Sequence, residues 1–146
     1  MAVYFDDCDW GDAVYSNRFE RCGFGVFIGG GNLHPVVGNE FTDCACGVHV
    51  DSRGITWRPR GVFLPDKDRP DVSWYLKWLL PHDYRHGAWG IRYPELHALL
   101  SDRPEYPRVN PITDNVFRRC ERVFSFDKDA CTVTNEMPVA RNVVIP

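Results

Sequence analysis

The stretch Asp71–Leu100, DVSWYLKWLLPHDYRHGAWGIRYPELHALL, holds three of the five tryptophans, three of the five histidines and the densest run of aliphatic residues. Four of its apolar residues follow the i, i+3, i+4, i+7 spacing of one helical face: Val72, Tyr75, Leu76 and Leu79. Trp74 and Trp78 form a second apolar line on the same predicted helix, which covers about residues 70–80. A helix that is apolar around most of its surface is buried on two sides or covered by a partner.

Two further short helices are predicted after Pro81, which ends the first one. Residues 82–86 suit one helical turn, and Gly87 suits its left-handed stop. Residues 94–101 begin with proline and an acid, as helices often do. We therefore expect two or three short helices at the hydrophobic centre of the fold.

The rest of the chain predicts strands. Cys44–Val50 and Ile55–Trp57 flank Asp51–Gly54, which has the composition of a four-residue turn. Arg122–Phe126 and Cys131–Asn135 form a second hairpin signature, and 139–146 is predicted to be an edge strand.

The predicted fold is a single α+β domain over 1–146. We expect antiparallel β-hairpins with the short helices packed on the sheet. The segment 103–111 contains three prolines and is predicted to be an extended arm. We identify no internal repeat and no domain boundary.

Composition limits the functional classes. A net charge of −3 gives the whole chain no attraction to nucleic acid or to an anionic membrane. No apolar run approaches the roughly 20 residues of a membrane-spanning helix. The first residues, MAVYFDDCDWGD, do not resemble a secretory signal. We therefore expect an intracellular, cytoplasmic protein or one carried within a virion, and we expect its six cysteines to be reduced.

Two clusters have the residue types of a metal site. Cys44-x-Cys46-x-x-His49 fails as one, because a strand places His49 on the face opposite Cys44, Cys46, Val48 and Val50. His82-x-x-x-His86 is the better candidate, since imidazoles at i and i+4 of a helical turn can share a zinc ion.

A third ligand or a general base for that pair could come from Asp83, Glu95 or His97. No glutamate follows the first histidine, as it does in the H-E-x-x-H motif of zinc proteases. The same letters also fit histidines that cap carbonyls or stack on aromatic rings. The resulting hypothesis is a small zinc-dependent hydrolase that uses His82 and His86.

A third hypothesis is a nucleic-acid-binding accessory module. Proteins that bind single-stranded nucleic acid combine arginines with aromatic residues. Two such groups occur here: Arg53, Arg58 and Arg60 near Trp57, and Arg118, Arg119 and Arg122 near Phe117. The acidic balance of the chain disfavours nucleic acid as a partner.

The leading hypothesis rests on the five Trp, nine Phe, six Tyr and eleven Pro residues. Large aromatic side chains and arginine are enriched at the centres of protein interfaces. We expect a non-enzymatic structural or interaction subunit of a larger assembly, for example a virion component or an accessory subunit of a multiprotein complex. Its partners would be other subunits or further copies of the chain, and it needs no cofactor. The predicted contact residues are Trp74, Trp78 and Tyr106.

Overall fold

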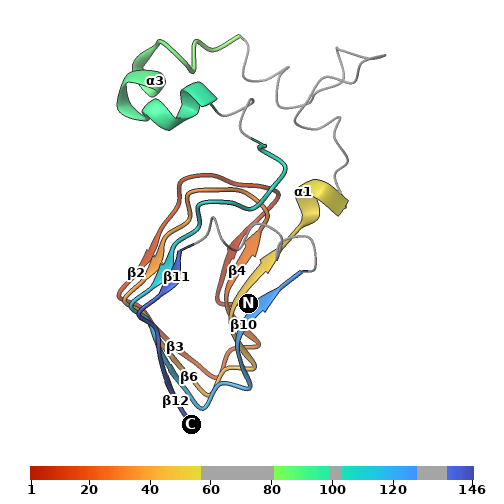
Figure 1. Cartoon of the computed structure of the whole chain (residues 1–146), viewed down its shortest axis with the longest axis vertical. Coiled ribbons are helices and arrows are strands. Elements are labelled where there is room, and N and C mark those ends of the chain that lie inside the picture. Colours follow the sequence, from red (N-terminus) through yellow and green to blue (C-terminus); the bar gives the residue numbers. More distant parts are fainter. Residues whose placement is uncertain (57–80, 99–102, 128–137) are drawn as a thin grey trace.

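A computed structural model describes residues 1–56, 81–98, 103–127 and 138–146 of the chain. Its strands form three sheets of four strands each, and every pairing among them is parallel. The chain visits the three sheets in turn and then starts again one layer further along (Figure 1). The fold is therefore a three-sided parallel β-solenoid with four coils.

Each sheet takes one strand from each coil. The first sheet contains β1 (Val3–Phe5), β4 (Phe24–Gly29), β7 (Cys46–Asp51) and β10 (Arg122–Phe126). The second contains β2 (Val14–Tyr15), β5 (Val36–Val37), β8 (Ile112–Thr113) and β11 (Val139–Ala140). The third contains β3 (Arg18–Glu20), β6 (Glu40–Thr42), β9 (Val116–Arg118) and β12 (Val143–Ile145).

The coils are built from a sequence repeat. Our prediction that the chain contains no internal repeat is therefore wrong. Val14–Cys22, Val36–Cys44 and Ile112–Cys120 share a Val/Ile, an Asn, a Phe and a Cys at the same four positions. The strand registers align these segments residue for residue, as in Val14 with Val36 and Phe41 with Phe117. The fourth coil keeps only the first half of the pattern, at Val139 and Asn142.

The corners of the coils use left-handed backbone. The residue before each repeat asparagine has positive φ, and so does the residue before each repeat cysteine: Ser16, Gly38, Asp114 and Arg141 at the first corner, and Arg21, Asp43 and Arg119 at the second. A left-handed residue turns the chain sharply enough to start the next face. Ion pairs join successive coils at these corners, with 2.6 Å between Asp114 and Arg141 and 2.7 Å between Asp43 and Arg119.

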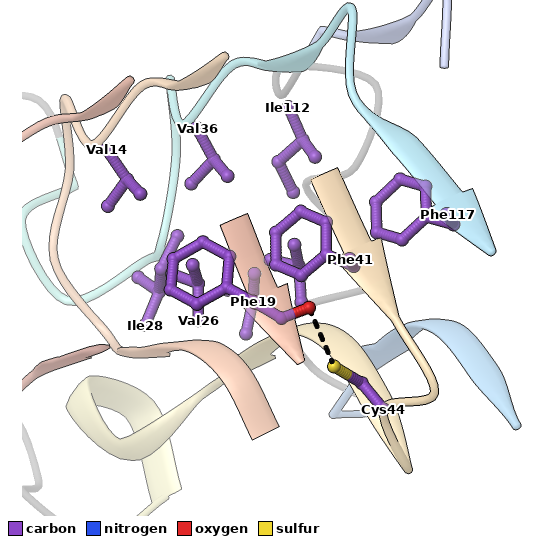
Figure 2. Close-up of a cluster of buried hydrophobic side chains, with 11 residues drawn as sticks. Val14, Phe19, Val26, Ile28, Val36, Phe41, Cys44, Ile112 and Phe117 are labelled. Atoms are coloured by element: carbon purple, nitrogen blue, oxygen red, sulfur yellow. Dashed lines mark hydrogen bonds between the residues drawn. The ribbon is translucent and has the colours of Figure 1, made fainter. Parts of the chain in front are cut away.

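The interior is filled by columns of identical or similar side chains. Phe19, Phe41 and Phe117 stack with ring centres 4.8 and 4.7 Å apart, as Figure 2 shows. A second column is formed by Val14, Val36 and Ile112, all buried. Burying each of these side chains contributes about 1.5–3 kcal/mol, so stacking the coils supplies most of the driving force for the fold.

Glycines on the first sheet make room for the phenylalanine stack. A Cβ atom at Gly25 would lie 2.6 Å from the Phe41 ring, and one at Gly47 would overlap the Phe117 ring. The rings therefore pack against bare backbone, and a side chain at either glycine would displace one of them.

A buried asparagine ladder runs beside the stack. The Oδ1 atoms of Asn39 and Asn115 each accept the backbone N–H of the equivalent asparagine one coil earlier, at 2.9 Å. Their Nδ2 atoms donate to the carbonyl oxygens of Val14 and Val36, also at 2.9 Å. Asn142 makes the same bonds to the third coil. The ladder satisfies corner backbone groups that the short strands leave unpaired.

The third coil is interrupted by an insertion between β7 and β8. Its described part contains α1 (Arg53–Thr56), α3 (Ala88–Arg92) and the 3-10 helix η2 (Pro94–Ala98). Figure 1 shows that α3 and η2 lie clear of the three sheets rather than on a sheet face.

The predicted α+β fold with antiparallel hairpins is therefore wrong. β7 pairs in parallel with β4 and β10, and the predicted turn Asp51–Gly54 instead ends β7 and starts α1. An alternation of apolar residues marks a strand equally well in either direction, and Asp51 is placed to bind Arg53 rather than to close a hairpin.

The predicted helices also differ from those observed. Residues 81–86 form turns, and the segment predicted as a helix over 94–101 is a 3-10 helix in its described part. The predicted helix of 70–80 and the strand of 131–135 lie outside the described residues. Within the described residues, no helix is long and apolar enough to cross a membrane.

Some strand predictions are confirmed, but the strand predicted for Ile55–Trp57 is wrong, because Ile55 and Thr56 belong to α1. Cys44, Cys46, Val48 and Val50 are buried, as expected. His49 lies on the opposite face, where its ring packs 4.4 Å from that of Phe27. The edge strand predicted within 139–146 is confirmed as β11 and β12.

Candidate functional site

The outer edge of the fourth coil is the candidate site. β11 and β12 are the outermost strands of their sheets. Val144 occupies the position of the stacked phenylalanines and is 58% exposed, whereas Phe41 and Phe117 are fully buried. Val139 continues the column of Val14 and is 39% exposed. Positions that form the core in three coils are thus open to solvent in the fourth.

We call Val139, Val143 and Val144 the end surface. Val143 donates its N–H to Asn115 and Ile145 accepts one from Arg119, so both residues face the third coil. Because N–H and C=O groups alternate sides along a strand, those of Val144 point to the outer edge. The end surface therefore combines exposed valines with strand edges that pair with no strand in the described part of the chain, and such edges favour pairing with another chain.

The opposite end of the solenoid differs in character. Its interior residues Val14 and Phe19 are buried. The exposed side chains near its edge include Arg18 and Glu20, which form an ion pair at 2.7 Å. The first coil thus exposes both charged side chains and the ring of Tyr15, whereas the fourth coil exposes valines at positions that are core in the other coils.

The residues at which the insertion leaves the third coil form a charged cluster. Arg53 is bound through two nitrogens by Asp51, at 2.9 and 2.7 Å, and donates to the Tyr4 hydroxyl at 2.6 Å. It also pairs with Asp6. Its guanidinium lies over the ring of Phe27. Arg53 thus ties the start of the insertion to the first coil.

The ionisable groups in and near this cluster stabilise the fold. The hydrogen bond from Tyr4 and the charge of Arg53 lower the pKa of Asp6, even though desolvation opposes them. Nearby, burial raises the pKa of the Cys8 thiol to about 12, so this cysteine stays protonated and is a poor nucleophile.

The predicted histidine pair lies in the insertion. His82 and His86 are exposed and lie in turns rather than on one helical face. The Nδ1 atom of His86 is 3.1 Å from Oδ1 of Asp83, and the centre of its ring is 6.0 Å from that of His97. Within the described residues, no group of three or more His, Cys, Asp or Glu side chains is placed to hold a metal ion.

Of the three predicted contact residues, the structure describes only Tyr106. Trp74 and Trp78 lie outside the described residues. Tyr106 is half-buried and packs against the hydrophobic core, with Arg103 5.7 Å from the centre of its ring. The arginines proposed for nucleic acid are engaged in part: Arg118 pairs with Glu40 and Arg119 with Asp43.

Free thiols line one corner of the solenoid. Cys22, Cys44 and Cys120 occupy equivalent positions in three successive coils, and Cys44 is buried. Each thiol donates to a backbone carbonyl two residues earlier, at 3.4 to 3.7 Å. They fill the corner as small hydrophobic side chains.

Comparison of the chain with protein-family models, with curated proteins and with solved structures finds no match.

Proposed function

We propose that the protein is a non-enzymatic structural subunit of a larger protein assembly, and that it assembles through the end surface. The observation that carries the proposal is the exposure of Val144 at a position that is core in the other coils. A coil of a solenoid buries its apolar face only against a neighbouring coil, so the exposed valines of the fourth coil favour contact with another chain.

A second copy of the chain is the partner that this surface favours. The end surface consists of valines, whereas the exposed side chains near the opposite end include the ion pair of Arg18 and Glu20, so end surface against end surface buries fewer charged groups than a head-to-tail stack. A two-fold arrangement of this kind is also the commonest symmetry of protein oligomers. The dimer would then extend the solenoid to eight coils with the two insertions far apart.

The test is the solution mass of the full chain, measured by light scattering over a range of concentrations. Wild-type protein is expected to dimerise, and Val144→Glu is expected to remain monomeric because it places two carboxylates at the shared axis. Ile91→Glu is the matched control, since Ile91 is exposed in the insertion and lies outside the end surface. A wild-type protein that stays monomeric at high concentration contradicts the proposal.

A charge exchange tests the geometry. Val144→Lys should also be monomeric, and mixing it with Val144→Glu should restore dimers, because position 144 meets its own copy across a two-fold axis. In a head-to-tail stack position 144 would meet the first coil instead, and mixing would restore nothing.

A further inference from the structure

A cleft lined by aromatic residues, the aromatic cleft, lies between the solenoid and the insertion. It shares no residue with the end surface. It consists of two adjoining cavities of about 270 and 250 Å3. The larger cavity is lined by the rings of Trp10, Trp89 and Tyr93, by Leu33, and by the carboxylates Asp12 and Glu95. The smaller one shares Trp10, Leu33 and Glu95 and adds Asn32 and Arg108.

The solenoid wall of the cleft is held rigidly. The buried His34 ring lies between two backbone oxygens, with Nε2 2.6 Å from that of Asp9 and Nδ1 3.2 Å from that of Asp12. These contacts fix both ends of the loop that carries Trp10. Gly31 allows the loop to approach, because a Cβ atom there would overlap the carbonyl oxygen of Asp9.

Leu33 is held in an unusual backbone conformation. Its φ is +63°, in the left-handed region that a bulky side chain seldom adopts. Strain of this size persists only where the surrounding structure enforces it, and such residues cluster at binding sites.

The insertion wall presents aromatic faces to solvent. Trp89 lies on α3 and Tyr93 directly follows it, with stacked rings 6.0 Å between centres, and Trp89 is 64% exposed. The guanidinium of Arg92 already lies 6.0 Å from the centre of the Tyr93 ring. Rings of this wall therefore accept a cation within the protein itself.

The charge of the larger cavity selects the ligand. Among the described residues, its lining contains the acids Asp12 and Glu95, and the guanidinium of Arg92 lies on the Tyr93 ring. Asp9 lies behind Asp12, where burial and a hydrogen bond to the Asp12 carboxyl raise the pKa of Asp9. Anionic ligands are thus disfavoured. Aromatic faces combined with carboxylates suit a cation whose surface is alkyl.

We propose that the aromatic cleft binds a trimethylammonium group, packed on Trp10 and Trp89 with Glu95 and Asp12 as counter-charges. Free choline and a trimethylated lysine side chain both carry this group. The smaller cavity would receive the remainder of such a ligand beside Asn32 and Arg108.

The experiment is a calorimetric titration of the full chain with choline, with trimethyllysine and with 3,3-dimethylbutanol, a neutral molecule of the same shape as choline. Saturable binding of choline or trimethyllysine, at least about tenfold tighter than that of the neutral analogue, is expected from cation–π and carboxylate contacts. The tighter of the two cations identifies the source. Equal binding of the neutral analogue, or no saturation by either cation, overturns the proposal.

Variants locate the site. Trp89→Ala should weaken cation binding about tenfold, since it removes one of the two ring faces on which the cation packs. Glu95→Gln should weaken the cations and leave the neutral analogue unchanged. Ile91→Ala is the control on the same helix, because Ile91 is exposed and does not line the cleft. An unchanged thermal midpoint shows that each variant is folded, and unchanged affinity in Trp89→Ala places binding elsewhere.

Discussion

The solenoid and the insertion treat their apolar side chains in opposite ways. In the first three coils the valines, isoleucine and phenylalanines of the repeat are buried. In the described part of the insertion Tyr84 is buried, while Trp89, Ile91 and Tyr93 are exposed. A coil gains its cover from the coils beside it. The described part of the insertion is not flanked by coils in this way, and its apolar residues Trp89, Ile91 and Tyr93 stay exposed.

The largest expected difference between the two regions comes from removing a ring of the phenylalanine stack. Phe41→Ala should destabilise the protein by about 3–5 kcal/mol, because Phe41 is fully buried between two other rings. Ile91→Ala in the insertion should change the free energy of unfolding by less than about 0.5 kcal/mol. Urea unfolding of both variants measures the difference, and equal losses would remove the distinction between the two regions.

The asparagine ladder should come next in size. Asn115→Ala leaves the backbone N–H of Asn39 and the carbonyl of Val36 without their buried partner, at a cost of roughly 2–3 kcal/mol. Asn17 is exposed in the first coil, so Asn17→Ala should cost less than about 1 kcal/mol. The comparison of the two urea midpoints tests whether burial gives the ladder its strength. If Asn17→Ala is the more damaging, the ladder does not work in this way.

A glycine in the insertion separates local from global stability. A Cβ atom at Gly90 would overlap the carbonyl oxygen of Arg85, so Gly90→Ala should displace α3. Amide exchange across 81–98 should become about tenfold faster or more while the solenoid amides stay protected. Gly23→Ala is the control, because nothing lies within 4 Å of a Cβ atom there. Faster exchange throughout the solenoid would show that the two regions unfold as one unit.

The smallest effect concerns pH and His49, on the outer face of the first sheet. Burial lowers the pKa of His49 below its ordinary value of 6.5, although Asp127 opposes the shift at 4.0 Å. The stability that this group contributes is therefore complete above the unfolded pKa and is lost as the pH falls through the window beneath it. Between about pH 7 and pH 5, wild-type protein should lose more stability than His49→Gln. Identical pH profiles would mean that His49 titrates normally.

The sequence predicts the strands better than their arrangement. The alternation in Cys46–Val50 and Arg122–Phe126 is visible locally and gives the correct elements. It carries no information on strand direction, which depends on residues far away in the chain. The repeat of Val, Asn, Phe and Cys could have supplied that information, but the insertion places the third copy 76 residues after the second. A search restricted to neighbouring segments therefore misses it.

The candidate surfaces were harder to foresee. The end surface follows only once Val144 is aligned with Phe19, Phe41 and Phe117, which requires the coil register. The aromatic cleft joins Trp10 to Trp89 across most of the chain. The sequence around these residues gives no sign of the cleft. The positive φ of Leu33 marks the site only once the structure is known.

The spacing of the ladder asparagines also sets an order of folding. Asn17 and Asn39 are 22 residues apart and Asn115 and Asn142 are 27 apart, but Asn39 and Asn115 are separated by 76. Closing the longer loop costs about 1 kcal/mol more in chain entropy, and non-local closure slows folding. The first two coils can thus pair early, even while the rest of the chain is being synthesised. Registration of the third coil then becomes the slow step, and the first two coils serve as its template.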